Sequence, residues 1–102
     1  MNAERYQTVI TETMQKSLNT LTDKAKEYAR KEDMFHNFEV AAVLKGETRE
    51  EALFGFMDKH LVSISDMVPN AGNYTQEKWQ EKIGDTINYL LILSAMVSEY
   101  AD

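Results

Sequence analysis

Residues 81–97, EKIGDTINYLLILSAMV, decide the fold class of this chain. Apolar residues recur here at helical spacing within a helix predicted over residues 76–101, and one stripe of it carries Trp79, Ile83, Ile87, Leu90 and Val97. From residue 89 onward the segment is apolar nearly all round, and such a helix must be covered on more than one face. A chain of 102 residues buries a limited fraction of its surface, so we expect a second subunit to provide the cover in a homo-oligomer.

The remainder of the chain repeats the helical period. We predict a long helix over residues 3–31, a short one over 38–45 and another long one over 49–68. The first of these carries an apolar stripe that we interpret as a packing face: Tyr6, Val9, Ile10, Met14, Leu18, Leu21, Ala25 and Tyr28. The sequence therefore predicts an all-α fold of three long helices plus a short one, in a single domain over residues 1–102.

Start and stop signals flank these helices. Thr48 and Glu51 have the spacing of a capping box, which opens a helix, and Gly46 is placed to end the short helix before it. Thr75 is placed to cap the last helix. The turn-forming residues 68–75, VPNAGNYT, predict a loop between the last two helices.

Composition excludes several classes of function. The net charge of −6 argues against non-specific binding of DNA or RNA, which requires a basic face. The absence of cysteine excludes disulfides and thiolate metal sites and fits a cytoplasmic protein. The N-terminal residues do not form a signal peptide, and every apolar run is too short to span a membrane. A nucleotide ligand remains compatible, because a few basic residues or a divalent ion can hold a phosphate.

One candidate site lies on the last helix. Glu81, Asp85 and Asn88 share one face at spacings of four and three residues. Two carboxylates and an amide suit a hard cation such as Mg²⁺, with water completing the coordination, and Glu81 and Asp85 are its candidate ligands. The alternative is an ordinary solvated helix face.

A second candidate site lies on the preceding helix, at Lys59 and His60. Lys59 is a candidate contact for a phosphate, although a solvated surface lysine is the alternative. His60 falls on the apolar stripe, where a histidine is more often a core residue than a ligand. A neighbouring helix that carries Asp85 or Asn88 could give it a hydrogen bond.

A third candidate site joins the end of the first helix to the connector after it. Lys24 would bind a phosphate, Tyr28 and Phe38 would stack on a base, and Asn37 would read its edge. The alternative is a helix end that is basic to complement its dipole, followed by phenylalanines that enter the core. Neither a nucleophile elbow nor a glycine-rich phosphate loop occurs in the sequence.

Three blocks of the sequence together resemble a known family. KAKEYARKEDMFHNF (24–38), FMDKHLVSISDMV (56–68) and EKIGDTINYLLIL (81–93) resemble small phage and prophage proteins with a nucleotide-modification-associated domain. These proteins are placed near the MazG-like nucleotide pyrophosphohydrolases. The resemblance implies a MazG-like helical bundle, assembled as a homo-oligomer, with a small nucleotide as ligand and the host cytoplasm as its location.

The resemblance also indicates where this chain differs from the active enzymes. MazG-like enzymes hold Mg²⁺ with Glu-x-x-Glu on one helix and Glu-x-x-Asp on a later one. This chain has Lys59 and His60 in the region of the first motif and Lys82 three residues before Asp85, so that only Asp85 matches cleanly. We therefore expect nucleotide binding without hydrolysis or cofactor, in sequestration of a (cyclic) nucleotide signal of host defence.

Two alternatives remain open at this point. One is a Mg²⁺-dependent nucleoside triphosphate pyrophosphohydrolase or another enzyme of phage nucleotide metabolism, with Asp85, Glu81 and either Asp66 or Asp58 around the metal. The other is a helical interaction protein without a small ligand. The sequence leaves undecided whether the chain is an enzyme.

Overall fold

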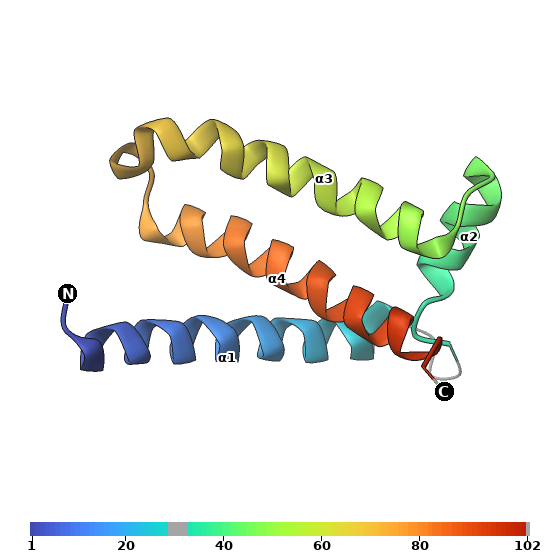
Figure 1. Cartoon of the computed structure of the whole chain (residues 1–102), viewed down its shortest axis with the longest axis horizontal. Helices are drawn as coiled ribbons and strands as arrows, with labels where there is room; N and C mark the ends of the chain where they lie inside the picture. The colour runs from blue at the N-terminus through green and yellow to red at the C-terminus, as the bar shows by residue number, and fades with distance from the viewer. Residues whose placement is uncertain (29–32, 102) are drawn as a thin grey trace.

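The chain is all-α, and its four α-helices pack as a small bundle (Figure 1). The computed structural model describes residues 1–28 and 33–101, and of residues 24–28 it describes the backbone alone. The elements in chain order are α1 (Ala3–Tyr28), α2 (His36–Lys45), α3 (Arg49–Met67), the 3₁₀-helix η1 (Val68–Asn73) and α4 (Gln76–Ser98). The prediction of three long helices and a short one is thereby confirmed.

The predicted start and stop signals act as expected. The Thr48 hydroxyl accepts a hydrogen bond from the backbone N–H of Glu51, and the Glu51 carboxylate accepts one from the N–H of Thr48, which is the reciprocal capping box. The Thr75 hydroxyl accepts from the N–H of Lys78 at the start of α4. Gly46 has a φ of 67°, the left-handed conformation that ends a helix without strain only at glycine.

Several predicted boundaries need correction. The loop predicted over residues 68–75 begins instead with η1, because the proline in its first turn has a φ angle already suited to a helix. The short helix starts earlier, at His36, where the carboxylate of Asp33 accepts from the N–H of Phe35 just before it. α4 ends at Ser98. Residues 29–31 of the first predicted helix lie outside the described residues.

α4 lies in the middle of the bundle (Figure 1). α3 packs against it in the antiparallel direction, α1 packs against it in the parallel direction, and α2 packs on α3. In the described part of the chain α1 makes no contact with α3, so the three long helices form an open layer. The buried apolar core lies among α2, α3 and α4 and consists of Ala42, Ala52, Leu53, Met57, Met67 and Met96.

A single arginine ties one end of this core together. The Arg49 guanidinium, at the start of α3, lies 3.1–3.5 Å from three carboxylates, those of Glu39, Glu50 and Glu99. It also donates to the carbonyl oxygen of Met96 near the end of α4. Arg49 therefore links α2, α3 and α4 through hydrogen bonds that are assisted by charge.

Candidate functional site

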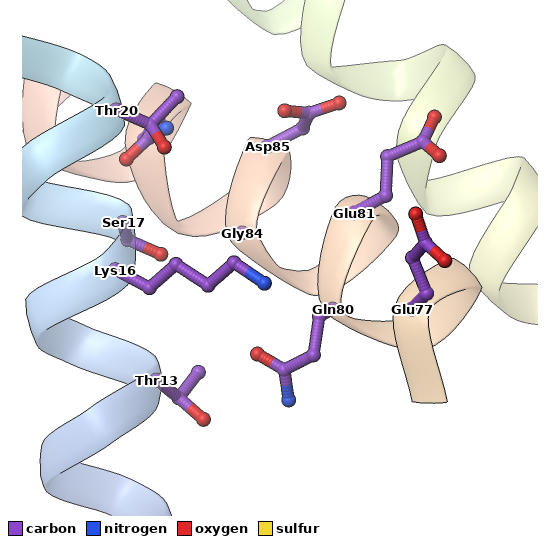
Figure 2. Close-up of a pocket in the computed structure, with 10 residues that line it drawn as sticks. Thr13, Lys16, Ser17, Thr20, Glu77, Gln80, Glu81, Gly84 and Asp85 are labelled. Carbon is purple, nitrogen blue, oxygen red and sulfur yellow. The ribbon is translucent and has the colours of Figure 1, made fainter. Parts of the chain in front are cut away.

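A polar cleft lies between α1 and α4, on one side of the seam where these helices pack (Figure 2). We call it the α1–α4 cleft, and its volume is about 270 Å³. Its lining consists of Thr13, Lys16, Ser17 and Thr20 from α1 and Glu77, Gln80, Glu81, Gly84, Asp85 and Asn88 from α4. Every side chain in this lining is polar or absent, so the cleft suits a ligand with many hydrogen-bonding groups and not an apolar one.

Helical periodicity brings these residues together from two segments far apart in the sequence. The cleft residues on α1 are separated by three, one and three positions, and those on α4 alternate between separations of three and one. This is the spacing of residues on one face of a helix. The helices approach most closely at Gly84. A Cβ atom added there would lie 3.4 Å from the Oγ of Ser17, which is only 3% exposed. Small side chains at this point let the two helices close while the polar residues beside them stay accessible.

The cleft has more negative than positive charge. Figure 2 shows the Lys16 side chain extending from α1 across the cleft toward Gln80. Three carboxylates, those of Glu77, Glu81 and Asp85, follow one another along α4 at intervals of one turn, which is roughly 6 Å of rise. Among the described residues no ion pair joins Lys16 to them, and no three acidic or histidine side chains converge as a metal cluster.

A buried polar group of the cleft is the side-chain amide of Asn88. Asn88 is only 7% exposed, and its Oδ1 atom has no hydrogen-bond partner within the chain. Most buried polar atoms are hydrogen-bonded, and an unpaired one destabilises the fold by about 1–3 kcal/mol. The atom has almost no accessible surface, so a bound molecule would meet it only once the amide turns toward the cleft.

Asp85 lies where the cleft meets the seam between α3 and α4. Its Oδ2 is 3.7 Å from the Nδ1 of His60, within ion-pair range but too far for a hydrogen bond, and Nδ1 is buried without a partner. The His60 ring lies 5.4 Å from the ring of Tyr89. Burial, followed by the nearby Asp85 carboxylate, raises the pKa of Tyr89, so the phenol stays neutral.

The residues predicted from the last helix meet in one place. Glu81, Asp85 and Asn88 all line the cleft, and His60 lies 3.7 Å from Asp85 without the hydrogen bond that the sequence suggested. Glu81 and Asp85 occupy successive turns, so they could share one Mg²⁺ if water and a ligand supplied the other positions. The metal site stays a prediction.

The remaining predicted residues lie outside the cleft. Lys59 is exposed on α3, and Asn37 is exposed on α2. The ring of Phe38, which is half-buried, packs edge-on against Phe56 with centroids 5.8 Å apart. The side chains of Lys24 and Tyr28 lie outside the described residues, so the third candidate site stays a prediction.

Sequence reasoning missed the α1 wall of the cleft. Thr13, Ser17 and Thr20 recur at spacings of four and three, with Lys16 beside them. Hydroxyl residues at helical spacing next to an apolar stripe are a usable signal, because small polar side chains on a packing face point to a polar neighbour. Gly84 gave a second signal, since a glycine inside a helix often marks a close approach.

No protein-family model, no curated protein and no solved structure matches this chain. The function must therefore be inferred from the residues and their geometry.

Proposed function

We propose that this chain binds a nucleotide in the α1–α4 cleft and holds it without hydrolysing it. The observation that carries the proposal is the buried, unpaired Oδ1 of Asn88 in a cleft that is otherwise polar. A carboxamide can accept from and donate to the edge of a nucleobase at the same time. Once the amide turns toward the cleft, a base that donates to Oδ1 would remove the energetic penalty of the unpaired atom, so binding would stabilise the fold.

The charges of the cleft suggest how the rest of a nucleotide would lie. Lys16 is the cation of the lining, and the hydroxyls of Thr13 and Ser17 beside it can donate to phosphate oxygens. The carboxylates of Glu81 and Asp85 would repel a bare phosphate but accept hydrogen bonds from ribose hydroxyls. We therefore infer that the phosphate lies toward α1 and the ribose toward α4.

The choice of a nucleotide among polar ligands rests on the resemblance of the three sequence blocks to the phage and MazG-like proteins. The same resemblance supports a MazG-like arrangement of the helices in a homo-oligomer and a biological role in sequestering a nucleotide signal. The alternative, a Mg²⁺-dependent pyrophosphohydrolase, is favoured by one observation, the row of carboxylates along α4. In that case Glu81 and Asp85 would hold the ion, which would polarise the phosphate and activate water.

The test is a thermal-shift and calorimetric titration with nucleoside monophosphates, nucleoside triphosphates and cyclic nucleotides, each with and without Mg²⁺. A ligand at a hundred times its Kd should stabilise the fold by about 2.7 kcal/mol. The ligand should be recovered intact after the protein is denatured. Release of pyrophosphate that depends on Mg²⁺ would support the alternative, and the lack of any shift with every nucleotide would refute both.

A matched pair of variants locates the site. Asn88→Leu removes the amide from the cleft while keeping the number of side-chain heavy atoms, and it should abolish binding. Because it also removes an unpaired buried oxygen, it should raise the free energy of unfolding of the ligand-free chain by about 1–3 kcal/mol. Asn37→Leu makes the same exchange at an exposed position on α2 and should leave binding unchanged. Loss of binding in Asn37→Leu but not in Asn88→Leu would move the site to the connector after α1.

A further inference from the structure

The apolar stripe predicted as the packing face of α1 is largely uncovered within the chain. Ile10, Met14 and Leu18 are each 43–50% exposed, and so are Leu90 and Val97 on α4. Together with the half-buried Ile83 these residues form what we call the outer face. The prediction that the α1 stripe packs is thus corrected in part: inside one chain, about half of each of these α1 side chains stays exposed.

The outer face lies on one continuous side of the molecule, opposite the α1–α4 cleft. α1 and α4 run in the same direction (Figure 1). Seen along their common direction, successive side chains therefore rotate in the same sense on both helices. At 3.6 residues per turn, the cleft residues Lys16 and Asp85 are rotated to one side of the α1–α4 seam. The same helical period puts Leu18 and Leu90 on the opposite side of the α1–α4 seam. The two stripes therefore merge into one apolar surface.

The chain exposes more surface than a compact monomer of its mass. The chain exposes 7501 Å², whereas a compact monomer of 11.7 kDa exposes about 5,900 Å². Its radius of gyration is 15.7 Å, against about 13 Å for a compact domain of this length. The excess of about 1,600 Å² per chain is within the range that obligate homodimers bury, about 1,000–2,500 Å² per subunit.

The chemistry of the outer face favours a second copy over other partners. From residue 6 to residue 21 of α1, the charged side chains Glu12 and Lys16 are rotated away from the stripe, and the exposed side of α4 around Leu90 carries no charge. An uncharged apolar surface is complementary to itself, as a twofold interface requires, even though each copy has a net charge of −6. Helices that lie on membranes instead flank their apolar side with lysine and arginine.

We propose that two copies of this chain pair through their outer faces, with α1 and α4 of one copy packed on α1 and α4 of the other. Each cleft then faces away from the interface and stays open, so a dimer would present two independent ligand sites. The pairing does not depend on the proposed function. A chain that dimerises but binds no nucleotide would leave this proposal intact and refute the previous one.

Sedimentation velocity over a range of concentrations tests the pairing. The wild-type chain should sediment as a dimer at micromolar concentration. Leu18→Glu and Leu90→Glu each place two carboxylates in the interface and should weaken the dimer by at least about a hundredfold while the helical circular dichroism is kept. Val62→Glu is the matched control, because Val62 is an equally exposed apolar residue on α3 outside the outer face. It should leave the dimer unchanged.

Crosslinking gives a second measurement that needs no destabilising charge. The chain has no cysteine, so Met14→Cys and Val62→Cys each carry one thiol. A bismaleimide should join two copies at position 14 and not at position 62. A monomeric wild-type chain, an assembly that Leu18→Glu and Leu90→Glu leave intact, or crosslinking at position 62 alone would overturn the proposal.

Discussion

The contact between Gly84 and Ser17 leads to a prediction that connects stability with the cleft. Gly84 lies inside α4, where glycine is less favourable than alanine by about 0.5–1 kcal/mol. A Cβ atom at this position would meet the Ser17 Oγ at 3.4 Å, which is ordinary van der Waals contact. We therefore expect Gly84→Ala to raise the free energy of unfolding by about 0.5–1 kcal/mol, or Tm by roughly 2–8 °C for a domain of this size.

Gly55 provides a matched control on α3. It too lies inside a helix, and a Cβ atom added there would meet nothing within 4 Å. Gly55→Ala should therefore show the helix-propensity gain alone, and the difference between the two variants measures the contact of α4 with α1. Guanidinium and thermal denaturation followed by circular dichroism give both values.

The two variants should differ in their affinity for the ligand even though both stabilise the fold. The new methyl group at position 84 faces the cleft lining and narrows it, whereas the one at position 55 lies far from the cleft in the sequence and on another helix. We expect weaker nucleotide binding in Gly84→Ala and unchanged binding in Gly55→Ala. If Gly84→Ala destabilises the chain while Gly55→Ala stabilises it, α1 lies closer to α4 than we describe and the reasoning about the cleft fails.

Three further predictions concern the core, the arginine cluster and its pH dependence. Leu53→Ala should lower the free energy of unfolding by about 2–5 kcal/mol, measured by denaturation, because Leu53 is 0% exposed and the variant leaves a cavity. Arg49→Met should lower Tm and loosen the end of α4, which hydrogen exchange at the Met96 region would detect, because it leaves three carboxylates without their cation. The Tyr100 hydroxyl donates to Glu50 and lowers the pKa of Glu50, and the same bond raises the pKa of Tyr100. Because the pKa of Glu50 is lowered, the bond stabilises the fold above the ordinary value of 4.5, and this stabilisation is lost as pH falls. Because the pKa of Tyr100 is raised, the bond also stabilises the fold below the ordinary value of 10.0, and this stabilisation is lost as pH rises. The Tm difference between wild type and Tyr100→Phe should therefore be greatest between these values, and a pH-independent difference would contradict the assignment.

Local signals in the sequence predicted most of the helical structure. The capping box at Thr48 and the left-handed glycine at Gly46 act within a few residues, so they define the ends of helices before any tertiary contact is known. The 3.6-residue period likewise identified which residues form an apolar stripe on α1. It could not say what covers that stripe, because the period of a helix reports its own faces and not its neighbours. For that reason the sequence predicts that Ile10 and Leu18 pack, whereas in a single chain both side chains are about half exposed.

The cleft was predictable on one wall only. Asp85 and Asn88 share a face of one helix, and that follows from spacing. The opposite wall comes from α1, more than sixty residues earlier in the sequence, and its pairing with α4 depends on the close approach at Gly84. Charged and aromatic groups are the usual signs of a binding site in a sequence, so the hydroxyl residues Thr13 and Ser17 do not stand out.

The three sides of α4 differ in composition. One side of this helix packs on α3 through Met96, which is fully buried, and another carries the uncharged outer face around Leu90. The third side, against α1, is also buried at Asn88 but keeps an amide with an unpaired oxygen there. An apolar residue of the same size would stabilise the fold better at that position, because an unpaired buried oxygen costs about 1–3 kcal/mol. Under the proposed function, a ligand that donates to this oxygen would offset that cost.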